Sequence, residues 1–438
     1  MRTSAALLSA VPLVLAADPQ QPLIAIPLTK APMSANRALS ENGTTAVTVR
    51  NLGDAAYFAD VSLGTPAQQF IFHIDTGSSA AWVGSKACNM KLQCNDRASF
   101  DQAKSSTFVD ISNGTLSDIK YGSGQVFGYN AKDTFKWGPL TIPNQQFMLV
   151  SREDDTIFQE QGGYVDGLIG LSFQGGIKDQ PAYYYPTVIG NMIENKLISS
   201  PVFSMWLNGT SEANGLDWLM NGGEIVFGGI DTTRYSGTLQ YFPVVDPYFW
   251  AVKLEGVSVG STVVSLDKRY SAMLDSGTSL IYIHTDALLP LLAPIYGALG
   301  MNAPSPTKKG FYIVPCDRST ALPDIQIQLG NFNYPLSWFD YVIALDENVC
   351  ALGVVAGGTA KEMNYQWILG DVFLRRYFSV YDFGDGNAAS VAASGARIGL
   401  ATAAHSSKPY TGVTTRKTSG SEGLGAGVVA ALLFLLWA

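Results

Sequence analysis

The segment Phe72-His73-Ile74-Asp75-Thr76-Gly77-Ser78-Ser79 decides the fold, because a segment of the same design, Ala272-Met273-Leu274-Asp275-Ser276-Gly277-Thr278-Ser279, follows 200 residues later. In both, apolar residues lead into an Asp, and a small hydroxyl residue, a Gly and two more hydroxyl residues follow. Each acid also precedes an apolar-apolar-Gly triplet, whose Gly (Gly170 or Gly370) lies 95 residues further on. A repeat of this length predicts two similar lobes, each presenting one acid at a tight turn.

Length and composition agree with two lobes built mainly from β-strands. The chain has 438 residues, of which 47% are apolar and 15% charged, with 44 Gly. This length exceeds what one hydrophobic core normally serves, and the composition is that of a folded, turn-rich protein. The net charge of −8 argues against a nucleic-acid partner, because phosphates attract Lys and Arg.

The N-terminal segments are typical of a protein that enters the secretory pathway. Residues 1–17 are predicted to be a signal peptide, since Arg2 precedes an apolar run that ends in small residues. Residues 18–50 show no sustained periodicity and contain basic residues. We therefore expect a propeptide that is processed after Arg37 or Arg50.

The C-terminal segments predict attachment to a membrane. Residues 404–420 form a Ser/Thr-rich tail, and the 15 residues from 424 to 438 are wholly apolar. This run is shorter than the roughly 20 residues that span a bilayer as a helix. Small residues before an apolar terminus predict that residues 421–438 are a glycolipid (GPI) anchor signal and that Ser419 is the attachment site. A true membrane helix is the alternative.

Cysteines and sequons also fit an oxidising, extracellular setting. Four cysteines allow three pairings, of which one local pair in each lobe is the simplest. These cysteines are Cys88, Cys94, Cys316 and Cys350. Three Asn-Gly-Thr triplets predict N-glycosylation at Asn42, Asn113 and Asn208.

The pattern between Tyr57 and Ala403 predicts short strands punctuated by Gly, Pro and Asn. We expect lobes over residues 51–235 and 236–403, with the crossing between them at 235–241. Hairpins are expected at Gly64-Thr65-Pro66 and over residues 119–126. Helices are expected over residues 185–197 and 285–299, with short helical turns after Asp101 and Trp338.

Two acids brought together by such turns would form an acid–base pair. Two carboxylates about 3 Å apart repel by roughly 5 kcal/mol at an effective dielectric of 20, or about four pK units. One carboxyl would therefore ionise while the other keeps its proton. A water between Asp75 and Asp275 could then attack a peptide carbonyl without a metal, cofactor or covalent intermediate. Ser78 and Thr278 are placed to bind the outer carboxylate oxygens, and the Thr76 and Ser276 hydroxyls can tie the turns together.

Taken together, these motifs resemble the pepsin family of aspartic endopeptidases over residues 55 to 403. Beyond the two acid turns, the motifs that carry the resemblance are Tyr57-Phe58, Gly64-Thr65-Pro66-Ala67-Gln68, Trp82-Val83, Tyr121-Gly122, Asp166-Gly167-Leu168-Ile169-Gly170, Phe227-Gly228-Gly229-Ile230-Asp231 and Trp367-Ile368-Leu369-Gly370-Asp371-Val372-Phe373. The resemblance implies an all-β, bilobal fold with the active-site cleft between its lobes.

The resemblance also implies roles for individual residues. Asp75 and Asp275 would be the catalytic pair, and Tyr121 would lie on a flap with Trp82 hydrogen-bonded to it. The disulfides would be Cys88–Cys94 and Cys316–Cys350. Residues expected to line the substrate site and flap are Tyr121, Gly122, Ser123, Ser78, Gly77, Gly277 and Thr278.

Several departures from the family pattern bear on specificity. Ala80 and Ala81 replace larger residues before Trp82, which would widen a wall near the flap. The segment before Asp166 is long and acidic, and its acids are Glu153, Asp154, Asp155 and Glu160. They form either a solvated loop face or a subsite that favours Lys or Arg before the cut. A subsite for Lys or Arg, together with the anchor signal, resembles the yapsin-like branch of fungal proteases. The alternative expectation is a preference for bulky apolar residues before the cut.

Other functions explain fewer of these features. Gly256-Val257-Ser258-Val259-Gly260 matches a serine-hydrolase motif, but it falls in what we expect to be one alternating strand over residues 252–264. Three histidines without a His-Glu-x-x-His motif disfavour zinc. His73 is expected to pack in a strand and not to shuttle protons. An inactive binding protein is disfavoured because both acids are present.

The sequence therefore predicts a monomeric peptidase made as a zymogen. Its expected partners are protein and peptide substrates and, through the anchor, the membrane. It would lie at the plasma membrane or in the cell wall, and it would work at acidic pH.

Overall fold

The computed structural model describes the backbone of residues 24–30 and then residues 56–86, 88, 97–122, 124–153, 166–174, 186–209, 222–266, 270–346, 349–359, 361–364, 366–385 and 395–404. Several predicted features lie outside these residues. They are the signal peptide, most of the propeptide, Asn42, Cys94, Ser123, Asp154, Asp155, Glu160, the Ser/Thr-rich tail, Ser419 and the anchor signal.

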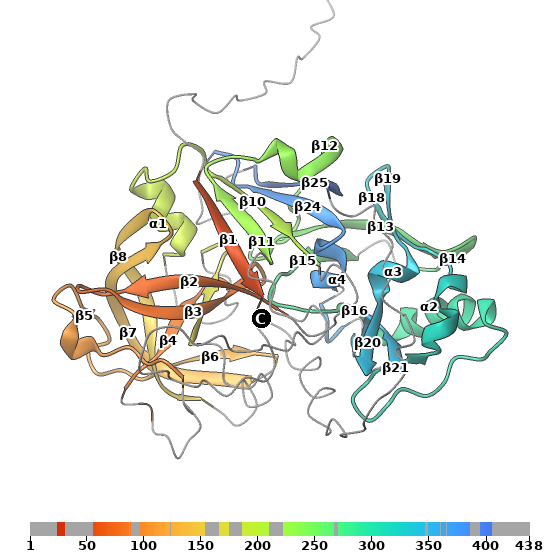
Figure 1. Cartoon of the computed structure of the whole chain (residues 1–438), viewed down its shortest axis with the longest axis horizontal. Helices are drawn as coiled ribbons and strands as arrows, with labels where there is room; N and C mark the ends of the chain where they lie inside the picture. Colours follow the sequence, from red (N-terminus) through yellow and green to blue (C-terminus); the bar gives the residue numbers. More distant parts are fainter. Residues whose placement is uncertain are drawn as a thin grey trace, which may run out of the picture.

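The larger of the sheets has 14 strands and runs through both halves of the chain (Figure 1). Its order is β12 (Tyr235–Pro243), β25 (Arg397–Ala403), β24 (Tyr377–Asp382), β10 (Val202–Leu207), β11 (Gly223–Phe227), β1 (Ile24–Lys30), β2 (Tyr57–Leu63), β3 (Gln68–Asp75), β9 (Gly167–Gly170), β4 (Ala81–Gly84), β8 (Leu140–Glu153), β7 (Gly124–Trp137) and β5 (Val109–Asp110). Strand β6 (Ser117–Tyr121) pairs with β7.

Two smaller sheets build the second lobe, on the right in Figure 1. An eight-stranded sheet has the order β19 (Phe332–Leu336), β18 (Ile325–Leu329), β13 (Ala251–Val259), β15 (Ser271–Leu274), β23 (Gln366–Leu369), β16 (Ile281–His284) and β22 (Val354–Gly358), with β14 (Thr262–Val264) paired to β13. A three-stranded sheet has the order β17 (Ile313–Val314), β21 (Val349–Leu352) and β20 (Val342–Asp346).

The same local topology occurs in each lobe. In the first, β3 runs parallel to β9, β9 antiparallel to β4, and β4 parallel to β8. In the second, β15 runs parallel to β23, β23 antiparallel to β16, and β16 parallel to β22. Strand β3, which ends at Asp75, and strand β15, which leads into Asp275, hold the same place in the two arrangements. The predicted all-β, bilobal fold is confirmed.

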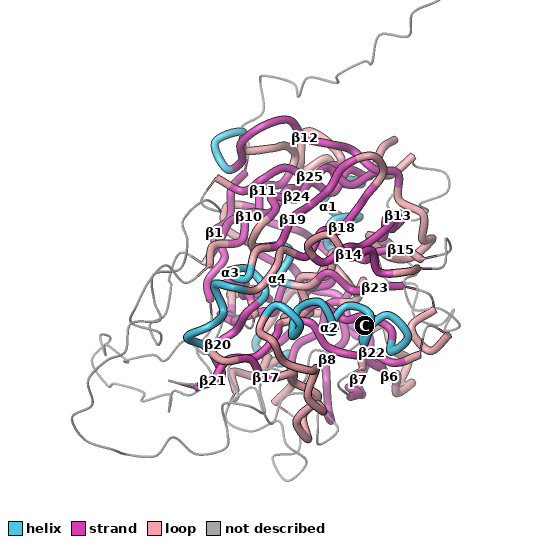
Figure 2. The backbone as a smooth tube through the Cα atoms, turned by 90° about the vertical axis from the view of Figure 1, so that its right-hand side faces the viewer, coloured by secondary structure: helices cyan, strands magenta, loops and turns pink. Residues whose placement is uncertain are grey.

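Helices are few and short, as the cyan segments of Figure 2 show. The α-helices are α1 (Val188–Glu194), α2 (Thr285–Ala298), α3 (Trp338–Tyr341) and α4 (Asp371–Leu374), and the 3-10 helices include η2 (Gln102–Lys104), η4 (Thr232–Arg234) and η5 (Cys316–Ala321). The four expected helical segments are confirmed, although α1 begins later than expected. Its start is fixed by Thr187, whose hydroxyl accepts a hydrogen bond from the Gly190 amide and so caps the helix.

The expectation of one strand over residues 252–264 is wrong. Strands β13 and β14 form a hairpin, with Val257 opposite Val264, and the turn contains Gly260 at a φ of 56°. Glycine adopts this left-handed backbone conformation readily, and the conformation ends the first strand. Ser258 lies inside β13, opposite Val263 and Gln326. It is therefore not at the strand-to-helix turn that a serine nucleophile needs.

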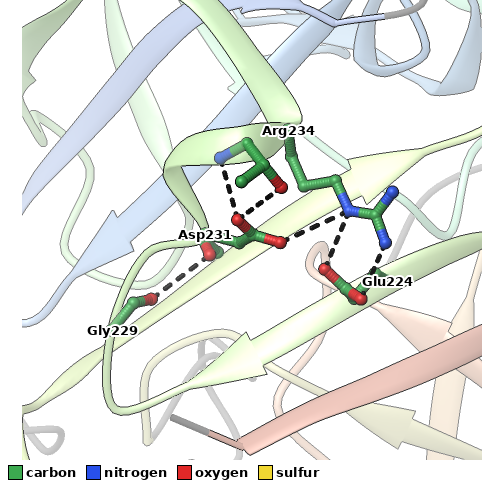
Figure 3. A network of polar contacts seen from close by, with 6 residues as sticks. Glu224, Gly229, Asp231 and Arg234 are labelled. Atoms are coloured by element: carbon green, nitrogen blue, oxygen red, sulfur yellow. Dashed lines mark hydrogen bonds and ion pairs between the residues drawn. The ribbon is translucent and has the colours of Figure 1, made fainter.

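A polar network fixes the chain where it turns from β11 into β12, at the expected crossing between the lobes (Figure 3). The Arg234 guanidinium donates to both carboxylate oxygens of Glu224, at 3.1 and 3.0 Å, and lies 3.5 Å from Asp231. Its plane also covers the Trp206 ring at 4.4 Å. Such a bidentate pair fixes direction as well as distance, so it sets the course of β12 toward β25.

Disulfide bonding agrees with one local pair in each lobe, as far as the described residues go. Cys316 is bonded to Cys350, with a Cα–Cα distance of 5.2 Å. Cys88 is also disulfide-bonded, whereas Cys94 lies outside the described part of the chain. Within that part, no helix is both long and apolar enough to cross a membrane.

Candidate active site

The two predicted acids stand at the ends of equivalent strands. Asp75 is the last residue of β3, and Asp275 directly follows β15. The amide of Gly77 donates to Asp75 Oδ1 at 2.7 Å, and the amide of Gly277 donates to Asp275 Oδ1 at 2.8 Å. Each turn thus uses its own glycine amide to orient its carboxyl group.

Hydroxyl groups bind the other oxygen of each acid, as expected from the sequence. Ser78 Oγ donates to Asp75 Oδ2, and Thr278 Oγ1 donates to Asp275 Oδ2. Hydrogen bonds to an ionised carboxylate stabilise its charge and lower its pKa. The two hydroxyls therefore oppose the effect of burial on both acids.

Thr76 and Ser276 lock the two turns together across the lobes. Thr76 Oγ1 donates to the Leu274 carbonyl at 2.9 Å and accepts from the Ser276 amide at 2.9 Å. Ser276 Oγ donates to the Ile74 carbonyl at 2.9 Å and accepts from the Thr76 amide at 3.1 Å. All four groups are buried, so these bonds are shielded from water and hold the acids in register.

Only glycine allows the turns to come this close. A Cβ at Gly77 would lie 2.5 Å from Asp275 Oδ1, and one at Gly277 would lie 2.5 Å from Asp75 Oδ1. Any larger residue at either position would collide with the acid of the opposite lobe. The glycine in each repeat is therefore required by the meeting of the two carboxyl groups.

The environment raises the pKa of both acids. Asp75 is 3% and Asp275 1% exposed. Burial raises the pKa of Asp75 well above its usual range, and the neighbouring charge of Asp275 raises it further. Burial also raises the pKa of Asp275, against the hydrogen bond from Thr278. Two adjacent buried carboxyls hold a proton between them, which supplies one acid and one base side by side.

Strands β6 and β7 form a hairpin that packs against Trp82 of β4, in the lobe that carries Asp75. It turns at Gly122, next to Tyr121, which ends β6 and accepts a hydrogen bond from Trp82 Nε1 at 2.9 Å. This is the contact that the family resemblance implied. Ala80 and Trp82 belong to one apolar cluster with Ile119 of the hairpin, whereas Ala81 belongs to the main core. Of the two alanines, Ala80 therefore lies in the cluster that includes the hairpin, and Ala81 does not.

Glu153, one acid of the predicted acidic segment, lies neither on a solvated loop face nor in a position to bind a substrate Lys or Arg. Glu153 ends β8, is 4% exposed, and accepts a hydrogen bond from Arg97 Nη2 in a buried ion pair. Glu153 is therefore not part of a solvated loop face. Its carboxylate is also committed to Arg97 and is not free to bind a substrate cation.

The residues behind the competing functions are packed in the interior. Among the described residues neither nitrogen of His73 has a hydrogen-bond partner, and its ring lies 5.2 Å from that of Phe58. His284 is also buried and stacks on Tyr270 at 4.2 Å. The described residues contain no group of three or more His, Cys, Asp and Glu side chains arranged for a metal ion.

Two residues near the acids were not predicted from sequence. Trp250 Nε1 donates to the Leu171 carbonyl at 3.0 Å, across the lobes. Tyr381 is fully buried, and its pKa is raised by burial and moderated by the hydroxyls of Ser379 and Thr76. Both side chains lie in aromatic clusters built from distant segments, so no local sequence pattern indicates them.

Comparison with known proteins agrees with this geometry. The model of the family described as eukaryotic aspartyl protease matches residues 56–394, and the chain belongs to this family. Gastricsin of Rattus norvegicus is 32% identical over 352 residues, which cover 80% of this chain and 81% of gastricsin. Vacuolar protease A of Aspergillus fumigatus is 33% identical over 344 residues, with coverages of 77% and 79%. Napsin-A of Mus musculus is 36% identical over 355 residues, with coverages of 79% and 77%. The protein is an aspartic endopeptidase, a hydrolase of peptide bonds.

Proposed function

We propose that Asp75 and Asp275 are the catalytic pair and that they hydrolyse peptide bonds at acidic pH. The observation that carries this proposal is the mirrored arrangement of two buried carboxyl groups, each held by one glycine amide and one hydroxyl. Their raised pKa values favour a singly protonated pair in mildly acidic solution.

The proposed reaction needs only these two carboxyls and water. The ionised carboxylate takes a proton from a water molecule held between the acids, and the water oxygen attacks the peptide carbonyl carbon. The protonated carboxyl gives its proton to the carbonyl oxygen, which yields a neutral tetrahedral diol. Transfer of a proton to the amide nitrogen then breaks the C–N bond and releases the amine and acid products. The pair ends with one proton, as it began.

The β6–β7 hairpin would act as the flap over the substrate. Tyr121, Gly122 and Ser123 would cover the bound peptide, and the Trp82 bond to Tyr121 supports a defined closed position. Gly77, Ser78, Gly277 and Thr278 would line the floor next to the scissile bond. Substrate would bind between the two lobes.

The protein would be made as a zymogen with a signal peptide at residues 1–17 and a propeptide at residues 18–50. Strand β1 (Ile24–Lys30) supports this proposal, because it pairs with β2 and β11 within the sheet that carries Asp75. Cleavage after Arg37 or Arg50 would detach this strand from the enzyme chain. The lobes would then be residues 51–235 and 236–403.

We further propose a cell-surface location. The Ser/Thr-rich tail (404–420) and the anchor signal (421–438) would attach a monomeric enzyme at Ser419 to the plasma membrane or cell wall, in the manner of a fungal yapsin-like protease. N-glycans would occupy Asn42, Asn113 and Asn208. An exposed turn with Asn113 at a φ of 50° supports the second of these sites.

Specificity would favour basic or bulky apolar residues before the cut. Of the acidic segment, Glu153 is committed to Arg97, so a preference for Lys or Arg would depend on Asp154, Asp155 and Glu160. We propose these three side chains as the candidate subsite.

The proposed function is tested with the processed protein and a peptide mixture of unbiased sequence. We expect cleavage in mildly acidic solution that a peptide mimic of the tetrahedral diol abolishes at one equivalent per enzyme. A serine-directed phosphonate and a metal chelator are the controls and should leave the rate unchanged. Binding of the mimic without cleavage would indicate an inactive binding protein and would overturn the proposal.

A further inference from the structure

We propose that Trp250 is a positioning residue for the catalytic pair, acting through hydrogen bonds that join the backbones of the two acid turns. This proposal rests on the roles proposed above for Asp75 and Asp275. Trp250 directly precedes β13 and is fully buried.

Three hydrogen bonds form a chain from one acid turn to the other. The Leu171 amide donates to the Asp75 carbonyl at 2.7 Å. The Leu171 carbonyl accepts from Trp250 Nε1 at 3.0 Å. The Trp250 carbonyl accepts from the Leu274 amide at 2.9 Å, and Leu274 immediately precedes Asp275. A single tryptophan, through its side chain and its own backbone, therefore connects the main chain at both acids.

This connection differs from that made by Thr76 and Ser276. Those hydroxyls bind the Leu274 and Ile74 carbonyls. The Trp250 carbonyl instead accepts from the Leu274 amide, and its indole binds Leu171, whose own amide donates to the Asp75 carbonyl. The direction of each carboxyl depends on the backbone on both sides of the aspartate. A displacement of about 1 Å at a catalytic group can cost on the order of 100-fold in rate, so support on both sides matters for the reaction.

An indole hydrogen bond is not shared by every buried tryptophan of the described residues. Trp137 and Trp367 are as deeply buried, and within the described structure their indole nitrogens have no hydrogen-bond partner. Burial of a tryptophan in this protein does not by itself require a partner for the indole. The bond from Trp250 therefore reflects its place between the lobes.

Aromatic packing holds the Trp250 ring in the orientation that this bond needs. Its ring centroid lies 4.2 Å from that of Phe173, 4.8 Å from Phe383 and 5.2 Å from Tyr381. Phe173 comes two residues after Leu171, so the same segment supplies both the acceptor and a packing surface. A second bond at this crossing, from Ser172 Oγ to the Tyr248 carbonyl at 2.6 Å, keeps the two segments aligned.

The test compares two variants at position 250. Trp250→Phe keeps an aromatic ring but loses the donor and some volume. Replacement of Trp250 by 3-benzothienylalanine keeps the size and shape of the indole and removes only the N–H. Trp137→Phe is the matched control, since it makes the same change at a buried tryptophan whose nitrogen has no hydrogen-bond partner among the described residues.

We expect both changes at position 250 to lower kcat by about 10-fold or more, with KM within about twofold of wild type. The apparent pKa values of the pH–rate profile should also shift, because a merely structural loss would not alter the pair's titration. Trp137→Phe should leave kcat and the profile unchanged. Rates are divided by the concentration of folded protein, which is measured from its peak in gel filtration.

Wild-type kcat and pH profile in the benzothienylalanine variant would overturn the inference, as would an equal loss of kcat in Trp137→Phe. The outcome is separable from that of the proposed function. If Asp275→Asn abolishes cleavage while both Trp250 variants are fully active, only the role of Trp250 is wrong.

Discussion

Trp82 and Tyr121 are joined by a hydrogen bond of 2.9 Å from the indole nitrogen to the phenol oxygen. The bond connects β4, which pairs with β9, the neighbour of the Asp75-bearing strand β3, to the tip of the β6–β7 hairpin. Trp82 is fully buried and Tyr121 is half-buried. The end of β6 is thus tethered to a buried side chain of β4.

Loss of this tether should weaken substrate binding. Trp82→Phe keeps the ring and removes the donor, and a hydrogen bond of this kind contributes about 1 kcal/mol. We expect kcat/KM to fall about five- to tenfold, mainly through a higher KM, while the thermal midpoint falls about as much as in the control, which loses the same buried volume. Steady-state kinetics with a fluorogenic peptide measure this, with Trp137→Phe as control. An unchanged kcat/KM would show that the tether does not serve the flap.

The catalytic pair should destabilise the enzyme at neutral pH. Both acids have a folded-state pKa above the ordinary value, so the folded protein gains stability as pH falls toward that ordinary value and is penalised when the pair ionises. We expect Asp275→Asn to have a higher thermal midpoint than wild type at pH 7. The difference should shrink as the buffer is acidified to about pH 3.5. A midpoint difference that does not depend on pH would contradict this reading of the pair.

His73 should change the pH dependence of stability in the opposite direction, with less stability at acidic pH. Burial lowers its pKa from the usual 6.5 to about 4, so the unfolded chain takes up a proton before the folded protein does. Stability from this residue is fully present above about pH 6.5 and is lost as pH falls to about 4, by about 3 kcal/mol.

Denaturant unfolding of wild type and His73→Leu between pH 7 and 4 measures this loss. The wild type should lose about 3 kcal/mol more than the variant over this range. Parallel losses in the two proteins would mean that His73 does not titrate as the structure indicates.

The buried Arg97–Glu153 pair should support the structure and not the choice of substrate. Glu153→Gln removes the negative charge from a buried ion pair with Arg97, and such a loss costs about 3–5 kcal/mol. We expect a lower thermal midpoint but an unchanged preference for residues before the cut. Asp101→Asn, which breaks a solvent-exposed pair with Lys86, is the control and should shift the midpoint little. A loss of preference for Lys or Arg in Glu153→Gln would place Glu153 in the subsite after all.

Much of the site could be predicted because it is encoded locally and twice. The Asp-Thr-Gly and Asp-Ser-Gly turns, the glycine at the tip of the β6–β7 hairpin and the start of α2 at Thr285 all depend on neighbouring residues. The repeat also indicated that the two acids meet, since equivalent turns in two lobes face one another.

Other features could not be predicted because they depend on distant parts of the chain. Glu153 meets Arg97, which lies 56 residues earlier, and only the fold shows that its charge is compensated. The indole bond of Trp250 spans 79 residues. The break between β13 and β14 has a local cause, Gly260, but the alternating pattern on either side concealed it.

The most direct test of the central claim compares wild type, Asp75→Asn and Asp275→Asn in the cleavage of the unbiased peptide mixture at about pH 4. Asparagine keeps the size of the side chain but neither accepts nor gives up the proton that the reaction needs. We predict that each variant loses at least about a thousandfold in rate while it still folds, as judged by circular dichroism. Cleavage by either variant at the wild-type rate would mean that the two acids are not the catalyst.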